Sequence, residues 1–266
     1  MLGKLIKHEW KAASRLILPL YLVLAVFTLI NSIMMRLGLY PRSGVLMLIP
    51  VFLIAGYVLS ILGIMIMTLV TLILRFYKNL MTDEGYLMFT LPVRTHELIT
   101  AKLLIACAWS VLSAIAVAAS LFAVLGTPET MAQISAGLRE FFLQSEAMFG
   151  MSGGVLIAVL GLAILVSLVH SILMVYASIA LGQLAGKHRV LLSFAAYVAL
   201  YTAIQILGVI MVVAVGMPLN NQPENMANVA RVVRQVMFAG IGLGAALSVA
   251  YYWGTQYILK KRLNLE

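Results

Sequence analysis

Residues 16–35 read LILPLYLVLAVFTLINSIMM, an apolar run of twenty residues without a charged side chain. An α-helix needs about 20 consecutive apolar residues to cross the hydrocarbon core of a bilayer. The one proline of this run, Pro19, lies in its first turn, where proline is tolerated. The run therefore predicts a membrane-spanning helix.

The rest of the chain repeats this pattern and excludes an ordinary soluble domain. Of its 266 residues, 63% are hydrophobic and 10% are charged, whereas about 25% of the residues of an average soluble domain are charged. No segment alternates as the strands of a membrane barrel do, over about ten residues at a time. We therefore expect an all-α, polytopic membrane protein with six transmembrane helices. The expected spans are residues 16–35, 51–75, 103–125, 154–184, 190–215 and 235–259.

The uneven distribution of lysine and arginine predicts the orientation of the spans. Thirteen of the 18 lie in the N-terminal segment, in the second and fourth connections and in the C-terminal segment. Cytoplasmic segments of membrane proteins carry the excess of basic residues, so both termini and residues 76–102 are expected in the cytoplasm and residues 127–152 outside. The same rule explains the net charge of +9 without nucleic acid, for which the chain has no motif. We expect the protein in a bacterial cell membrane.

The first residues, LGKLIKHEWKAAS at 2–14, have an amphipathic pattern. Their apolar residues recur at three- and four-residue steps, and their three lysines lie apart from most of these. With Trp10 on the apolar side, the pattern favours a basic amphipathic helix that lies in the membrane interface. The alternative is a basic flank that only sets the topology.

Two of the longer connections differ in character. The segment TPETMAQISAGLREFFLQSEAMF at 127–149 predicts a helix on or near the membrane surface. Its apolar side would be formed by Met131, Ile134, Leu138, Phe141 and Phe142. Residues 217–234, MPLNNQPENMANVARVVR, contain two prolines and four asparagines and are expected to form a polar loop.

The spans contain few groups that could do chemistry. Asn31, His170 and Gln205 are the residues that could line a substrate path. For His170 we favour the alternative role, a hydrogen bond between helices. The sequence from Gly182 to Gly186 is too short for a phosphate-binding loop, and no metal or nucleophile motif is present. We therefore expect no enzymatic activity, no metal and no cofactor in this chain.

Two pairs of glycines are spaced four residues apart, Gly182 with Gly186 and Gly240 with Gly244. Such pairs let the backbones of membrane helices approach closely. They are also common by chance in glycine-rich spans, so they indicate close packing without identifying the partner helices.

One segment between the spans, residues 76–102, combines acids, bases, aromatic residues and a proline. Thr82 or Asp83 can cap a short helix, and Pro92 ends it because the residue before a proline avoids the helical region. Thr95 can cap a second helix that leads into the third span. The segment is therefore expected to be a helix, a break and a helix. A loop that only packs under the other helices is the alternative.

This segment resembles a known family. EGYLMFTLPV at 84–93, followed by Glu97-Leu98 and by Lys102, is similar to the cytoplasmic loop of permease subunits of type-2 ATP-binding cassette (ABC) transporters. LIKHEWK at 5–11 and YILKKRLNLE at 257–266 are similar to the ends of the same subunits, so the resemblance covers the whole chain. The loop is the more specific of these signals.

The resemblance implies a transporter in which permease subunits move the substrate and ATPase subunits supply the energy. Two permease subunits, as a homodimer or a heterodimer, pair in the lipid membrane, and each receives a cytoplasmic ATPase subunit that binds ATP and magnesium. A coupling helix between the second and third spans docks on the ATPase, and ATP hydrolysis there drives export of a substrate. For this chain we expect a hydrophobic or peptide-like substrate. Residues 2–14 would match the family's elbow helix, whereas the long connection at 127–152 departs from its commonest plan.

The resemblance also implies which residues contact the ATPase. The acidic residues would meet basic or polar groups there, and Tyr86 and Phe89 would be apolar anchors. The implied contact residues are Asp83, Glu84, Gly85, Tyr86, Phe89, Leu91 and Pro92.

A second class of function is compatible with the same sequence. An integral membrane protein could act by binding alone, as an assembly or immunity factor without transport. An intramembrane enzyme is disfavoured because reactive residues are missing from the spans. A gene for a soluble ATPase next to the gene of this chain would favour the transporter.

Overall fold

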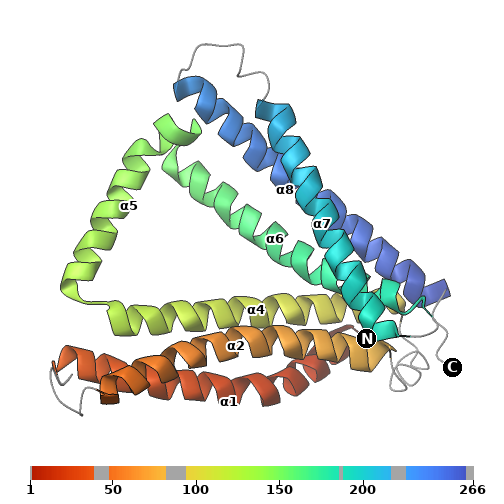
Figure 1. The fold of residues 1–266 in the computed structure, drawn as a ribbon, viewed down its shortest axis with the longest axis horizontal. Helices are drawn as coiled ribbons and strands as arrows, with labels where there is room; N and C mark the ends of the chain where they lie inside the picture. The colour runs from red at the N-terminus through yellow and green to blue at the C-terminus, as the bar shows by residue number, and fades with distance from the viewer. Residues whose placement is uncertain (1, 39–47, 82–93, 186–187, 217–225, 262–266) are drawn as a thin grey trace. The chain divides into compact units, whose positions relative to one another are not determined.

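The computed structural model of the chain describes residues 2–38, 48–81, 94–185, 188–216 and 226–261. These residues form seven α-helices and no strand (Figure 1). The helices are α1 (Leu2–Arg36), α2 (Leu48–Met81), α4 (Thr95–Leu125), α5 (Pro128–Phe149), α6 (Gly153–Gly182), α7 (Arg189–Gly216) and α8 (Met226–Lys261). The prediction of an all-α fold is confirmed.

Six of these helices, all except α5, are long and apolar enough to cross a membrane. Each of these six helices contains one of the expected spans in full, except that α6 does not include the last two residues of the fourth span. That span was expected to reach residue 184, but α6 ends at Gly182 and the chain turns there. The chain is a polytopic, all-helical membrane protein.

The outer surface of these helices is apolar in a way that suits lipid. Large apolar side chains are strongly exposed, for example Leu22 at 67%, Phe52 at 72% and Phe194 at 69%. Monomeric soluble proteins rarely expose continuous apolar patches larger than a few hundred square ångströms. The exposure along entire helices is therefore what a surface in contact with acyl chains requires.

The helix α1 joins two regions that the sequence suggested as separate. It runs from Leu2 to Arg36 as one helix, so residues 2–14 continue directly into the first span. The apolar side of these first residues packs against α4, where Ala13 contacts the buried Trp109, and Trp10 stacks on Trp109 with 4.8 Å between ring centroids. Much of the pattern that indicated an interfacial helix is thus explained by packing inside the protein, and the interfacial position stays a prediction.

The helix α8 begins earlier than expected. Residues 217–234 were expected to form a polar loop, but α8 starts at Met226, so residues 226–234 are helical. The guanidinium of Arg234 donates a hydrogen bond of 3.0 Å to the carbonyl of Gly150, just after the end of α5. A cation at this position suits the negative end of the helix dipole of α5. The first turns of α8 therefore form because they have a partner that the local sequence does not reveal.

The expected helix between the third and fourth spans is present as α5. Glu129 lies in its first turn, and Gly150 follows its end with a φ of 63°. This left-handed backbone favours glycine and lets the N–H of Gly150 bond the carbonyl of Glu146 at 3.0 Å. The helix is confirmed, and its place at the membrane surface stays a prediction.

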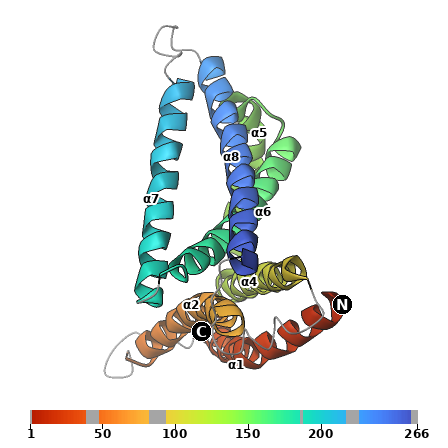
Figure 2. The same ribbon diagram turned by 90° about the vertical axis from the view of Figure 1, so that its right-hand side faces the viewer.

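The chain divides into two compact units. Unit 1 comprises residues 1–80 and 91–133 and contains α1, α2 and α4, with α1 packed along α4. Unit 2 comprises residues 81–90 and 134–266 and contains most of α5 together with α6, α7 and α8. Within unit 2, α6 packs against both α7 and α8, and Figure 2 shows α6 beside α8.

Candidate functional site at the base of the 76–102 segment

The predicted ATPase contact lies outside the residues that the structure describes. It comprises Asp83, Glu84, Gly85, Tyr86, Phe89, Leu91 and Pro92. The two flanks of the contact are described, as the end of α2 up to Met81 and as the start of α4 from Thr95. The candidate site consists of these flanks and of the residues that hold them together.

The second flank is a helix as the sequence predicts, but its N-cap is Arg94 rather than the expected Thr95. α4 starts at Thr95 and continues without interruption to Leu125, so residues 95–102 and the third span belong to one helix. The preceding residue, Arg94, has extended backbone, and its N–H donates to the carboxylate of Glu97 at 3.3 Å. This bond gives a partner to one N–H at the helix start. A displacement of Thr95 would thus be carried into the third span.

A buried carboxylate, Glu9 of α1, ties the two flanks together. Its Oε2 accepts hydrogen bonds from Arg75 of α2, at 2.5 Å from Nη2 and 3.1 Å from Nε. Its Oε1 accepts a bond of 2.7 Å from Nζ of Lys102 in α4. Asn79 Nδ2 lies 3.5 Å from the same Oε1. We call Glu9, Arg75, Asn79 and Lys102 the Glu9 cluster.

The charges of the Glu9 cluster are withdrawn from solvent. Glu9 is 7% exposed and Lys102 is 5% exposed, while the side chain of Arg75 is 18% exposed. Removing an ion from water costs several kcal/mol, which a pair recovers only with good geometry and further hydrogen bonds. Here each carboxylate oxygen meets a cation, and Lys102 Nζ also donates to the carbonyl of Arg75 at 3.3 Å. The cluster is thus internally satisfied, and the loss of any charge in it would leave another charge buried.

The Glu9 cluster lies where the two ends of the 76–102 segment meet. Arg75 directly precedes the 76–102 segment and Lys102 is its last residue, so the cluster closes the base of that segment. Glu9 adds the N-terminal part of α1 to the same base. Three helices are therefore fixed to one another where the segment leaves them.

The sequence contains a signal for Glu9 that the motifs and the family resemblance do not include. Glu9 is the only acidic residue among the first 82, in a stretch that is otherwise basic. It precedes Ala13 and Ile17 by one and two helical turns, and both of these are fully buried. An isolated acid on the buried side of a basic helix predicts a cationic partner from another helix.

The three residues proposed for a substrate path have local structural roles. Asn31, 1% exposed, donates through Nδ2 to the carbonyls of Phe27 at 2.9 Å and Leu53 at 3.2 Å, which joins α1 to α2. Asn31 belongs to unit 1, whereas His170 and Gln205 belong to unit 2, on α6 and α7. A substrate path that includes all three stays a prediction.

The other two residues of that set contact aromatic side chains. The ring of His170 lies 5.4 Å from that of Tyr251 in α8, which fits a residue packed between helices. Its Nδ1 is buried and has no hydrogen-bond partner among the described residues. Gln205 is exposed and donates to the hydroxyl of Tyr201 on the same helix at 3.0 Å.

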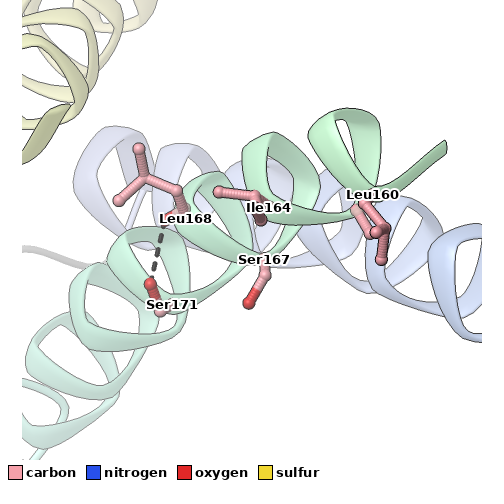
Figure 3. Close-up of a pocket in the computed structure, with 6 residues that line it drawn as sticks. Leu160, Ile164, Ser167, Leu168 and Ser171 are labelled. Atoms are coloured by element: carbon pink, nitrogen blue, oxygen red, sulfur yellow. Dashed lines mark hydrogen bonds between the residues drawn. The ribbon is translucent and has the colours of Figure 1, made fainter. Parts of the chain in front are cut away.

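A shallow depression of about 520 Å³ follows one side of α6 (Figure 3). Its lining comes from that helix alone and consists of Leu160, Ala163, Ile164, Ser167, Leu168 and Ser171. The hydroxyl of Ser171 is used within the helix, because it donates to the carbonyl of Leu168 at 2.9 Å. Without a charged group or a second wall, the depression is an outward side of a span and not a built binding site.

Close packing in unit 2 depends on two of the paired glycines. A Cβ added to Gly182 at the end of α6 would lie 2.0 Å from Oγ of Ser193 in α7, and one on Gly244 would lie 3.2 Å from Val166. Gly182 and Gly244 therefore bring α6 close to α7 and to α8. At Gly240 the nearest atom is 3.9 Å away, so this glycine is not needed for contact, and Gly186 lies outside the described residues.

Among the residues that the structure describes, no group of three or more His, Cys, Asp or Glu side chains could hold a metal ion. The single cysteine, Cys107 in α4, is half-buried with a free thiol. The chemistry available at the Glu9 cluster is thus ionic contact between helices.

Comparison with known proteins gives no match: neither a family model, nor a curated protein, nor a solved structure matches this chain. A proposal for its function therefore rests on the residues of the 76–102 segment, on the Glu9 cluster and on the six spans.

Proposed function

We propose that this chain is the transmembrane permease subunit of an ABC exporter and that residues 76–102 receive a separate cytoplasmic ATPase subunit. The resemblance of residues 84–93 to the coupling loop of such subunits supports this, as do the six apolar helices. The observation that carries the proposal is the Glu9 cluster, which fixes both flanks of the segment to α1.

A loop that transmits movement from a partner protein to the membrane spans needs a rigid base, whereas a loop that only packs under the helices does not. A partner that displaces the loop moves the spans only if the two ends of the loop are held together and cannot shift independently. Arg75 and Lys102 are held by one carboxylate, and Nζ of Lys102 also bonds the backbone of Arg75. A loop that merely packs under the helices needs no such buried charges, whose desolvation costs several kcal/mol per ion.

The energy source in this proposal is another chain. The expected spans contain no carboxylate, so they offer no acidic group for coupling export to an ion gradient. The chain also lacks a phosphate-binding loop, so ATP and magnesium belong to the partner ATPase. A second permease subunit completes the transporter, with both termini of each subunit in the cytoplasm. The apolar spans suit a hydrophobic or peptide-like substrate.

Co-purification with the ATPase tests the proposal. The chain is co-expressed with the ABC ATPase encoded beside its gene, in native form and with Glu84→Gln and Tyr86→Ala combined. We expect the double variant to lose ATPase association and to be inserted in the membrane in normal amount. The matched control likewise changes one glutamate and one aromatic residue, on α5, with Glu140→Gln and Phe142→Ala, both exposed in the structure, and should keep the association.

Two results would contradict the proposal at different points. Full association and full stimulation of ATP hydrolysis by the double variant would remove the coupling role from Glu84 and Tyr86. If the native chain itself bound no ATPase, a membrane protein that acts by binding alone would be the better account.

A further inference from the structure

Polar contacts between helices continue from the Glu9 cluster along unit 1. Tyr21 of α1 and Thr68 of α2 both bond the hydroxyl of Ser113 in α4, each at 2.9 Å. Further along, the hydroxyls of Tyr57 in α2 and Ser120 in α4 lie 3.1 Å apart. One residue of α4 thus joins the other two helices, and a second joins α2 again.

The contacts reach the end of unit 1 opposite the cluster. There Asn31 of α1 donates to the carbonyl of Leu53 in α2 at 3.2 Å, and Ser32 of α1 donates to the carbonyl of Ala123 in α4 at 2.9 Å. In lipid, burial of apolar surface does not drive helices together, and hydrogen bonds between them help to fix their arrangement. The helices α1, α2 and α4 are therefore held at both ends and in between.

We propose that Glu9 is a positioning residue that couples the 76–102 segment to α1, so that a displacement of the segment moves α1, α2 and α4 as one body. The inference rests on the proposed function for the source of the displacement. It adds that the N-terminal part of α1, which is far from the segment in the sequence, is part of the moving unit.

The charges explain why Glu9 in particular has this role. Without its carboxylate, the buried Lys102 and the partly buried Arg75 would be two like charges at neighbouring positions, since Lys102 Nζ lies 3.3 Å from the backbone carbonyl of Arg75. Their repulsion would separate the flanks of the segment. The carboxylate is thus what allows α2 and α4 to stay together at this level, and α1 carries it.

Among the described residues, the aromatic stacking and apolar packing that the structure records for α1 near the segment join it to α4. Trp10 stacks on Trp109, and Ala13 and Ile17 pack with Ile105 and Trp109. The link from this part of α1 to α2 is made by Glu9 with Arg75 and Asn79. A displacement of the α2 flank therefore reaches the N-terminal part of α1 through Glu9.

Spin-label distances in the purified complex with the ATPase test this coupling. In a background with Cys107→Ala, one label is placed on unit 2 at Lys260, and the second on α1 at Lys7 or on the α2 flank at Lys78; all three positions are exposed. Each distance is measured without nucleotide and with a non-hydrolysable ATP analogue. In the native complex we expect the analogue to change both distances together.

The variant Glu9→Gln separates the two responses. We expect its complex to bind the ATPase and hydrolyse ATP, while the Lys78 and Lys7 labels no longer respond to the analogue together, because the variant removes the ionic link from Glu9 of α1 to Arg75 of α2. A Lys7 label that still moves together with the Lys78 label in this variant would overturn the inference and leave the proposed function intact. The control Lys11→Gln, an exposed charge two residues further along α1, should leave both responses unchanged.

A charge swap keeps the test decisive if Glu9→Gln does not assemble. The double variant Glu9→Lys with Lys102→Glu keeps one carboxylate and two cations in the cluster. We expect it to restore assembly and the response of the label at Lys7 together. Restored assembly with a label at Lys7 that does not respond would show that Glu9 has a structural role alone. A native chain without a bound ATPase would instead refute the proposed function.

Discussion

The contact between Gly182 and Ser193 predicts a large effect from a single methyl group. A Cβ on Gly182 would lie 2.0 Å from Oγ, 2.5 Å from the backbone N and 2.7 Å from Cα of Ser193. The hydroxyl can rotate away, but the two backbone atoms cannot move unless α7 moves with them. Gly182→Ala is therefore expected to push the start of α7 away from the end of α6.

The size of the effect follows from two opposing terms. Overpacking a close contact costs about 1–3 kcal/mol, and replacing glycine by alanine inside a helix gains up to about 1 kcal/mol. Gly182 is the last residue of α6, so the gain is small there. Ser193 would also be displaced from its bonds to the carbonyls of Arg189 and Ile179, at 2.9 and 3.4 Å. We expect a net loss of about 1–2 kcal/mol in the free energy of unfolding.

Unfolding of the purified protein in mild detergent measures this loss. The matched control is Gly161→Ala on the same helix, where an added Cβ meets nothing within 4 Å. The control should be as stable as the native chain or more stable by up to about 1 kcal/mol. If Gly182→Ala were as stable as Gly161→Ala, the close approach of α6 and α7 at Ser193 would be refuted.

Two further predictions concern α5 and its end. In a Cys107→Ala background, Gly137→Cys on the exposed side of α5 should react with a membrane-impermeant maleimide from outside the cell; reaction from the cytoplasmic side alone would reverse the predicted orientation. Arg234→Gln removes the charged donor to the carbonyl of Gly150 and should lower the free energy of unfolding by about 1.5–3 kcal/mol. The exposed Arg231→Gln should change it by less than about 0.5 kcal/mol, and equal losses in these two variants would show that the Arg234 contact contributes nothing.

The spans could be predicted because lipid imposes a simple rule on sequence. A run of about 20 uncharged residues satisfies it without reference to the rest of the fold, which is why all six long apolar helices were expected. Their ends were less certain because they depend on contacts made after folding. α8 begins at Met226, ahead of the expected loop's end, and Arg234 in its first turns bonds Gly150 across 84 residues of sequence.

The base of the 76–102 segment shows the same limit. The start of α4 could be predicted to within one residue, with Arg94 as the N-cap instead of Thr95, because the signals for a helix start are local. The Glu9 cluster could not be predicted from local signals, because Arg75 lies 66 residues and Lys102 lies 93 residues from Glu9 in the sequence. The charge pattern placed Arg75 and Lys102 only on one side of the membrane, and nothing in it brings them to one carboxylate.

These separations have a consequence for biosynthesis. Glu9 leaves the ribosome first, and the chain must grow by another 93 residues before Lys102 follows. At about 5–20 residues per second, this takes roughly 5–20 s. During that time the carboxylate has to stay hydrated, so the first helix cannot settle in its final place as it is inserted. The cluster forms only when the third span arrives, which makes correct insertion of that span the event that completes the first half of the protein.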